Sequence, residues 1–180
     1  MQRIPVTSEI ELRAFTLADS AILFATIERN REWLRRWLPW VREGYSIEDT
    51  RAFLADCENA NASGISLTTG IWFSGKFCGA IGLHKIDLMH RSTSIGYWID
   101  ADFSGKGIMT SACRAMVSEG FMTYGIHRIE IRCATGNTAS CAIPRRLGFQ
   151  EEGLLREAEW LYDHWVDLKL FATLKNMWKG

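Results

Sequence analysis

The spacing of hydrophobic residues changes several times along the chain and predicts strands alternating with helices. Residues 9–15 (EIELRAF) alternate apolar and polar side chains, which predicts a half-buried first strand. A helical spacing follows, with Asp19 as the expected N-cap, one break near Asn30, and an end at Pro39. The first forty residues therefore predict one strand and one long, interrupted helix.

The next segment changes from a helical period to a period of two. Residues 46–62 predict a second helix, because Ser46 and Asp49 have the spacing of a capping box. Residues 65–84 then alternate on both sides of a Ser-Gly-Lys turn at 74–76. This pattern predicts a β-hairpin.

The middle of the chain predicts a strand, a helix and a strand. Residues 92–99 (STSIGYWI) predict the first strand, in which Gly96 indicates a bulge or a close backbone approach. Residues 127–135 (HRIEIRCAT) predict the second. Because a helix connects them, the two strands are expected to pair in parallel.

A further helix follows, with Asn137 as its expected cap and Gly148 at its end. Pro144 lies inside this helix and has no N–H to donate to the Ser140 carbonyl. We therefore predict a bend or a loosened turn between Ser140 and Pro144.

Two final strands are predicted over residues 150–160 and 164–174. No linker, repeat or low-complexity run interrupts the chain. The prediction is a single α/β domain over residues 1–180 with a mixed, mostly antiparallel sheet.

The helix between the parallel strands begins in a glycine loop that could bind an anion. Ser104, Gly105, Lys106 and Gly107 precede it, and two glycines let the backbone approach a ligand closely. The helix then directs its unpaired N–H groups into the same space, which favours phosphate. Its apolar stripe comprises Met109, Ala112, Cys113, Met116, Val117, Gly120, Phe121 and Tyr124.

Familiar nucleotide motifs do not fit this loop. A nucleotide P-loop needs Gly-Lys-Ser/Thr, but Lys106 precedes Gly107 and Lys76 precedes Phe77. The dinucleotide fingerprint fails as well, because Thr110 stands where its third glycine should be.

The loop resembles the acetyl-CoA loop of the GNAT superfamily of N-acetyltransferases, whose pattern is Gln/Arg-x-x-Gly-x-Gly/Ala. Gly107 matches this pattern, whereas Ser104 and Met109 depart from it. Residues 137–149 (NTASCAIPRRLGF) add a second match, because they resemble the next helix of the superfamily, Asn-x-x-Ser/Ala followed by Leu-Gly-Phe.

Within this superfamily, several segments of the sequence are most similar to the branch that acetylates the N-termini of ribosomal proteins. The segments that carry this similarity are WLRRWLPW (33–40), GYWID (96–100), GKGIMT (105–110) and EGLLREAEW (152–160). The resemblance covers nearly the whole chain. It implies a GNAT-like domain with helices on both faces of a sheet that splays at its parallel strand pair.

The resemblance also implies acetyl-CoA as co-substrate and a set of residues that bind it. The pantetheine arm is expected on the backbone from Tyr97 through Trp98 to Ile99. The phosphates are expected on the loop and the helix start. The implied contacts there are Gly105, Lys106, Gly107, Ile108, Met109 and Thr110, with Asn137 on the next helix.

Direct transfer from the thioester requires a base for the amine and an acid for the departing thiolate. The superfamily often uses a tyrosine as the acid, but Pro144 occupies that position here. Ser140, one turn earlier, is the nearest hydroxyl, as it is in the resembled branch. Glu159 is the preferred base, through water, with Glu157 and Asp163 as competitors.

Trp33, Trp37 and Trp40 have i, i+4 and i+7 spacing and are expected to share one helix face. Such a face is usually core. The alternative is that one edge lines an acceptor cleft, where rigid aromatic side chains bind a peptide at low entropic cost.

Composition limits the partners. The chain has 21 basic residues (Lys and Arg) and 21 acidic residues (Asp and Glu), so no overall electrostatic field attracts nucleic acid or an anionic membrane. The first residues lack the apolar core of a signal peptide, and no run of apolar residues is long enough to span a membrane. The five cysteines have no C-x-x-C spacing and the four histidines no metal-ligand spacing. These features predict a cytoplasmic protein with reduced thiols and no metal.

The identity of the acceptor is argued from protonation. An α-amino group has a pKa of about 8 and a lysine about 10.4, so a neutral lysine costs roughly 3 kcal/mol more at neutral pH. A protein N-terminus is therefore the expected acceptor. A small amine (polyamine, amino acid or antibiotic) and a non-catalytic acyl-CoA sensor remain as alternatives, and a homo-oligomer is left open.

Overall fold

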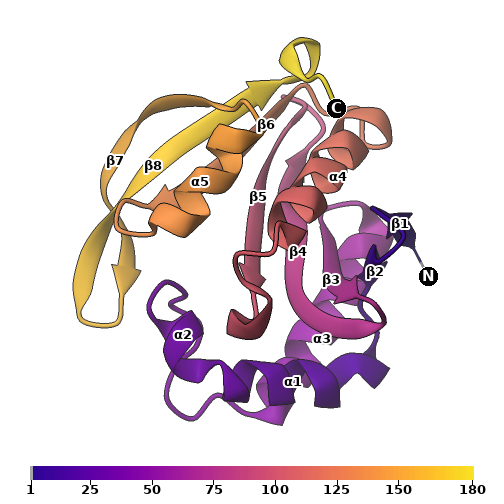
Figure 1. Ribbon diagram of the computed structural model, residues 1–180, viewed down its shortest axis with the longest axis vertical. Helices are drawn as coiled ribbons and strands as arrows, with labels where there is room; N and C mark the ends of the chain where they lie inside the picture. Colours follow the sequence, from indigo (N-terminus) through magenta and orange to yellow (C-terminus); the bar gives the residue numbers. More distant parts are fainter. Residues whose placement is uncertain (1) are drawn as a thin grey trace.

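The computed structural model describes residues 2–180. Its eight strands form one sheet in the order β1-β2-β3-β4-β5-β6-β8-β7 (Figure 1). Neighbouring strands are antiparallel except β5 and β6, which are parallel. The predicted mixed, mostly antiparallel sheet is confirmed. The strands are β1 (Arg3–Pro5), β2 (Ile10–Ala14), β3 (Leu67–Phe73), β4 (Lys76–Asp87), β5 (Ser92–Ile99), β6 (Arg128–Ala134), β7 (Gln150–Leu161) and β8 (His164–Leu174).

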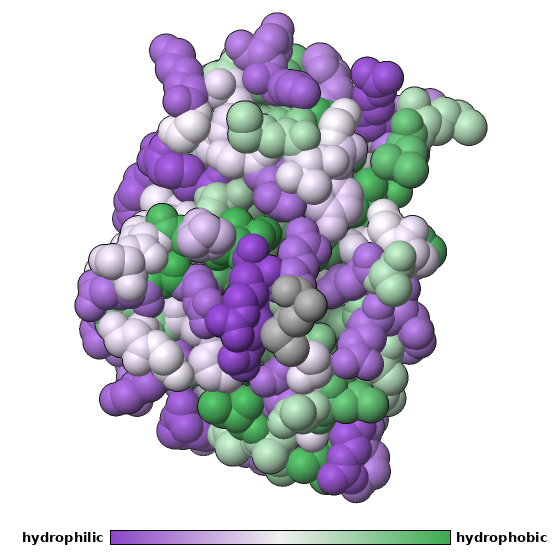
Figure 2. Space-filling model, turned by 90° about the vertical axis from the view of Figure 1, so that its right-hand side faces the viewer, coloured by the Kyte–Doolittle hydropathy of each residue, from purple (hydrophilic) through white to green (hydrophobic). Residues whose placement is uncertain are grey.

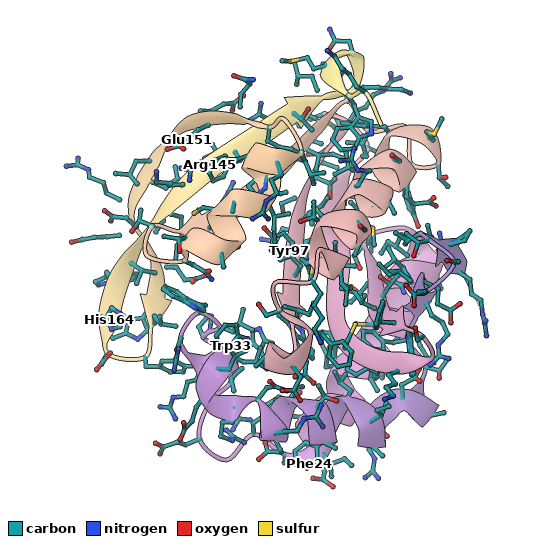
Figure 3. All side chains as sticks on the ribbon, viewed as in Figure 1. Phe24, Trp33, Tyr97, Arg145, Glu151 and His164 are labelled. Atoms are coloured by element: carbon teal, nitrogen blue, oxygen red, sulfur yellow. The ribbon has the colours of Figure 1, made fainter. Side chains whose placement is uncertain are left out.

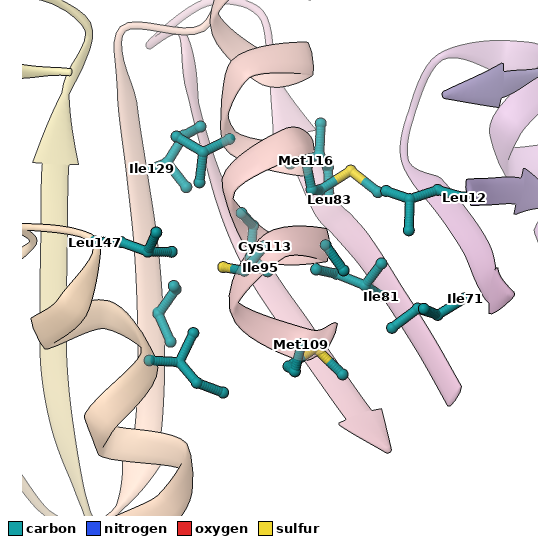
Figure 4. Close-up of a cluster of buried hydrophobic side chains, with 14 of the residues drawn as sticks. Leu12, Ile71, Ile81, Leu83, Ile95, Met109, Cys113, Met116, Ile129 and Leu147 are labelled. Carbon is teal, nitrogen blue, oxygen red and sulfur yellow. The ribbon is translucent and has the colours of Figure 1, made fainter. Parts of the chain in front are cut away.

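Helices cover both faces of this sheet, as predicted. Along β4, Ile81 and Leu83 belong to a core that includes α4 and α5, whereas Phe77 and Ala80 belong to a second core with α1 and α3. Figure 4 shows the first core, in which α4 packs over β4 and β5. The helices are α1 (Ser20–Arg29), α2 (Arg31–Arg35), α3 (Ile47–Ser63), α4 (Ile108–Met122) and α5 (Thr138–Arg146), and the 3-10 turns are Leu17–Asp19, Ala101–Phe103 and Lys175–Met177.

The first helical region begins where predicted but ends earlier than predicted. The break near Asn30 is confirmed, but α2 ends at Arg35 rather than continuing to Pro39. Trp37 and Trp40 therefore lie beyond the helix, and the prediction of one shared helix face is wrong. Asp19 is the N-cap residue of α1, as predicted, but its carboxylate accepts hydrogen bonds from Thr16 rather than from the first N–H groups of α1.

Other local predictions have mixed outcomes. The capping box is confirmed, since Asp49 N–H donates to Ser46 Oγ at 3.2 Å and Ser46 N–H donates to the Asp49 carboxylate at 2.8 Å. The bulge expected at Gly96 is wrong, because the register of β4 and β5 shifts between His84 and Asp87. A Cβ at Gly96 would lie 2.8 Å from the His84 ring, so a side chain makes the close approach.

The parallel pair separates toward the carboxyl end of β5. Pairing with β6 runs from Ser92–Arg128 to Ile95–Ile131, and no later pair follows. Asp100 N–H donates to the Cys78 carbonyl of β4 at 2.8 Å. Because alternate residues of an antiparallel strand face the same neighbour, the backbone groups of Tyr97 and Ile99 face the opening toward β6. The predicted splay is confirmed.

The surface that carries β1 and the beginning of the chain mixes hydrophilic and hydrophobic residues in small groups (Figure 2). Within residues 2–180, no helix has the length and hydropathy needed to cross a membrane.

Candidate active site

A cavity of about 400 Å³ opens where β5 and β6 separate. Its wall comes from the end of β5, the glycine loop with the start of α4, the α2 segment, and one side of α5. Figure 3 shows Tyr97 between β5 and α5, and Trp33 on α2 beside the end of β5. The lining residues include Trp33, Arg36, Trp37, Tyr97, Trp98, Ile99, Phe103, Gly105, Gly107, Ile108, Met109, Thr110, Asn137, Ser140, Ile143 and Arg146.

The glycine loop has the backbone that an anion site requires. Gly105 and Gly107 have φ of 75° and 77°, in the left-handed region that favours glycine. The first backbone bond into α4 is from Ser111 N–H to the Gly107 carbonyl at 3.0 Å. Helix geometry therefore leaves the N–H groups of residues 108–110 without an intrahelical acceptor, and these residues line the cavity.

Buried polar groups fix the strand end that leads into this loop. Asp100 is 1% exposed, forms an ion pair with Arg29, and accepts a hydrogen bond from Asp102 N–H at 3.1 Å. Asn30, in the break between α1 and α2, accepts from Ala101 N–H at 3.0 Å. The helix break thus has a structural role, since it holds the turn before the glycine loop.

Ser140 is held at the cavity wall by groups from three elements. Its N–H donates to Asn137 Oδ1 at 3.0 Å, and its hydroxyl lies 3.3 Å from both the Tyr97 hydroxyl and Cys133 Sγ. The Tyr97 hydroxyl also donates to the Ser140 carbonyl at 3.1 Å. Burial raises the pKa of the Cys133 thiol to about 11, which keeps it protonated near neutral pH.

The remaining predicted residues lie outside the cavity wall. Lys106 is not among the lining residues, and its ammonium lies 5.3 Å from the centre of the Phe103 ring. Glu159 is half-buried on β7, opposite Val166, and does not line the cavity. Burial raises the pKa of its carboxyl group.

The two competing carboxylates differ from Glu159 in their surroundings. Glu157 is exposed at an irregular position of β7, and its N–H donates to the Asp167 carboxylate at 2.7 Å. The pKa of Asp163 is lowered by its hydrogen bond with His164. Burial therefore makes the Glu159 carboxylate a better proton acceptor than that of Asp163.

One side of the cavity was only partly visible in the sequence. Trp33 and Trp37 line it, which agrees with the aromatic cleft alternative, but Arg36 beside them was not predicted, nor were Phe103 and Arg146 elsewhere in the cavity wall. The WLRRWLPW segment contained the clue to Arg36, because it places two arginines between tryptophans.

The tip of the β7–β8 hairpin braces this same side. The Tyr162 hydroxyl donates to the Leu38 carbonyl and lies 3.1 Å from the Val41 carbonyl. The Arg35 guanidinium lies 4.5 Å from the centre of the Tyr162 ring. The α2 segment is thus fixed by a residue more than a hundred positions away along the chain.

The charged side chains of the cavity wall are all positive. Arg36 and Arg146 are its charged residues, and none of the lining residues is Asp or Glu. Residues 2–180 contain no group of His, Cys, Asp and Glu arranged to hold a metal ion. The wall therefore suits anionic and apolar ligand groups better than polycations.

Comparison with known families gives a match to the acetyltransferase (GNAT) domain over residues 9–150. The chain is 34% identical over 176 residues to the putative ribosomal N-acetyltransferase YdaF of Bacillus subtilis (strain 168), covering 97% of this chain and 96% of that protein.

Solved structures give the same picture. RimL, a ribosomal L7/L12 alpha-N-protein acetyltransferase in complex with coenzyme A, matches with a TM-score of 0.92 and 29% identity, covering 96% of this chain and 98% of that one. The microcin C7 self-immunity acetyltransferase MccE, in complex with acetyl-CoA and AMP, matches with a TM-score of 0.89 and 29% identity, covering 94% of each chain.

Proposed function

The chain belongs to the GNAT acetyltransferase family and is an N-acetyltransferase that uses acetyl-CoA, and on that premise we propose that its acceptor is the α-amino group of a protein N-terminus. A ribosomal protein is the proposed partner, because YdaF and RimL are named for such substrates. We place the reaction in the cytoplasm, where the five unpaired, buried cysteines would stay reduced.

The observation that carries this proposal is the charge of the cavity wall. A polyamine acceptor carries several positive charges and needs carboxylates to bind it, but Arg36 and Arg146 are the charged residues of the wall. An N-terminus presents a single amine at the end of an extended chain. Trp33 and Trp37 offer aromatic surface to such a chain.

Amine acidity supports the same acceptor. An α-amino group, with a pKa of about 8, is a neutral nucleophile in a substantial fraction of molecules at neutral pH, unlike a lysine at about 10.4. The proposed base, Glu159, does not line the cavity and would act through water. Such a site acts most readily on the amine that loses its proton more easily.

The cofactor is proposed to lie along one side of the cavity, here called the cofactor side, formed by residues 97–99, 104–110 and 137–146. Its pyrophosphate would accept hydrogen bonds from the N–H groups at the start of α4 and pack against Gly107. The pantetheine arm would pair with the free backbone groups of Tyr97. The Ile99 carbonyl already accepts from Trp33 Nε1 at 3.2 Å.

The acceptor is proposed to enter on the opposite side, here called the acceptor side, formed by residues 33–41 and the tip of the β7–β8 hairpin. In the proposed reaction the amine attacks the thioester carbon directly, and the C–S bond then breaks. Ser140 stabilises the thiolate that departs, and Glu159 takes the amine proton through water. The amide is neutral once its proton has passed to Glu159, and the thiolate leaves hydrogen-bonded to Ser140 and takes its proton from water.

The test is release of free thiol from acetyl-CoA with matched acceptors. We expect turnover with peptides that have a free N-terminus and none with the same peptides blocked at the N-terminus. Spermidine, free amino acids and aminoglycosides complete the panel. Turnover on the small amines alone would contradict the proposal and assign the enzyme to small-molecule acetylation.

A further inference from the structure

Pro144 leaves a carbonyl inside α5 without its usual donor. In a regular helix the N–H of residue 144 would donate to the carbonyl of Ser140, but proline has no N–H. The predicted loosening does not interrupt the helix, because α5 is continuous from Thr138 to Arg146. A carbonyl in this half-buried position needs another donor.

Tyr97 supplies that donor from a different element. Its hydroxyl, at the end of β5, donates to the Ser140 carbonyl at 3.1 Å. The same hydroxyl accepts from Ser140 Oγ at 3.3 Å. One phenol group therefore contacts both the backbone and the side chain of the serine at the cavity wall.

We propose that Tyr97 is a positioning residue for catalysis, which uses the carbonyl left free by Pro144 to hold the Ser140 hydroxyl toward the thioester sulfur. This inference rests on the proposed role of Ser140. Tyr97 acts through Ser140 and gives up no proton in the reaction.

The surroundings of Tyr97 fit a fixed donor rather than an acid. Burial raises the pKa of its hydroxyl above the ordinary value, so the group stays protonated throughout the working range of the enzyme. Ser140 is meanwhile held at its N–H by Asn137, so the tyrosine fixes the other end of the same residue. When charge develops on the sulfur, the serine proton can turn from Tyr97 toward it, while the tyrosine proton remains on the carbonyl.

The test is a double-mutant cycle with Tyr97→Phe and Pro144→Ala. Tyr97→Phe keeps the ring and removes the hydroxyl, and we expect kcat to fall about tenfold, because one positioning hydrogen bond is lost, with the Kd for acetyl-CoA unchanged. Pro144→Ala restores an N–H that can donate to the Ser140 carbonyl. In the Pro144→Ala background, Tyr97→Phe should lower kcat by only about threefold or less.

Two further variants separate the possible outcomes. Tyr124→Phe removes the hydroxyl of a tyrosine that does not line the cavity, and it should leave kcat unchanged. In a Ser140→Ala background, Tyr97→Phe should cause no additional loss. Thermal unfolding of every variant checks that the compared proteins are folded at the assay temperature.

The results distinguish this inference from the role of Ser140. If Ser140→Ala has the wild-type kcat, the proposed role of the serine is wrong, and this inference fails with it. If Ser140→Ala lowers kcat but Tyr97→Phe costs the same factor in all three backgrounds, Ser140 keeps its role and the positioning role of Tyr97 is overturned.

Discussion

The two sides of the cavity are built in different ways. Most of the cofactor side comes from one stretch of chain, in which the end of β5, the glycine loop and the start of α4 supply mainly backbone groups, and residues 137–146 complete it. The acceptor side depends on Tyr162, which donates to carbonyls of the 36–41 turn from 121 and 124 residues away. Local sequence can specify that stretch of the cofactor side, whereas only the folded chain defines the acceptor side.

This difference suggests how each side responds to mutation. A change on the cofactor side should alter acetyl-CoA binding or the chemical step directly. A change on the acceptor side should alter the acceptor KM through the position of α2 and its turn. The five predictions below run from the largest expected effect to the smallest, and the first three test this division.

Ser140→Ala should lower kcat by about 10², the lower end of the range for general-acid help, because a thiol of pKa about 8.5 is already a moderate leaving group. The Kd for acetyl-CoA should change little, since the interaction strengthens only as charge develops on sulfur. Calorimetry and steady-state kinetics measure the two quantities. An unchanged kcat at saturating acetyl-CoA, with chemistry shown to be rate-limiting, would falsify the assignment.

Gly107→Asn should weaken acetyl-CoA binding by about tenfold while the helix start is retained. Asparagine tolerates the left-handed φ of 77° better than other residues with side chains, and a Cβ at this position meets no atom within 4 Å. The added side chain would occupy the space proposed for the pyrophosphate. Valine at this position would strain the left-handed backbone, so a loss of acetyl-CoA binding in Gly107→Val could not be separated from a loss of stability.

The matched control for that variant is Gly125→Asn, which has a φ of 64°, open space around its Cβ, and no place in the cavity wall. Its acetyl-CoA affinity should equal that of the wild type. Lys106→Ala should matter less than Gly107→Asn, because the proposed donors are backbone amides. Equal affinity in Gly107→Asn and wild type would exclude the loop as the pyrophosphate site.

The order and type of most elements could be predicted because each depends on nearby residues. The Ser46–Asp49 capping box begins α3, and the period of two gives the β3–β4 hairpin. The parallel β5–β6 pair also followed, because a helix joins the two strands. These features are local in sequence, so one chain is enough to show them.

The features that the sequence could not show depend on distant contacts. The helical period extends to Pro39, but the chain leaves the helix after Arg35, where the Tyr162 hydroxyl binds the following turn. The bond from Tyr97 to the Ser140 carbonyl likewise joins residues 43 positions apart. The missing N–H of Pro144 was visible in the sequence, but the group that replaces it was not.

Tyr162→Phe should raise the acceptor KM about threefold to fivefold and leave the Kd for acetyl-CoA unchanged. The ring and its contact with Arg35 remain, but the bond to the Leu38 and Val41 carbonyls is lost, at a cost of about 1 kcal/mol. Steady-state kinetics with a peptide acceptor measures the acceptor KM, and calorimetry measures the Kd for acetyl-CoA. A change in acetyl-CoA affinity instead would show that the two sides are not independent.

Glu159→Gln should reduce activity most at low pH, by a few-fold at pH 7 and less toward pH 9. Below a pH of about 8 the amine is mainly protonated and a base is needed, whereas above it the neutral amine is already abundant. Asp163→Asn is the control, because hydrogen bonding with His164 lowers the pKa of Asp163 and makes it the weaker base. An equal loss at every pH would remove Glu159 as the base.

The same substitution has a smaller effect on stability, with a sign that the pKa determines. Burial raises the pKa of Glu159 in the folded protein, so the folded state binds this proton more tightly than the unfolded state. The contribution of Glu159 to stability is therefore fully present below its unfolded pKa and is lost as the pH rises through the folded one. At high pH the buried carboxylate is charged, which costs free energy, and glutamine carries no such charge. The Tm of Glu159→Gln should therefore equal or slightly exceed the wild-type value at pH 8 and fall relative to it at pH 4. Scanning calorimetry at both values measures the difference, and a Tm difference independent of pH would show that Glu159 is not desolvated in the fold.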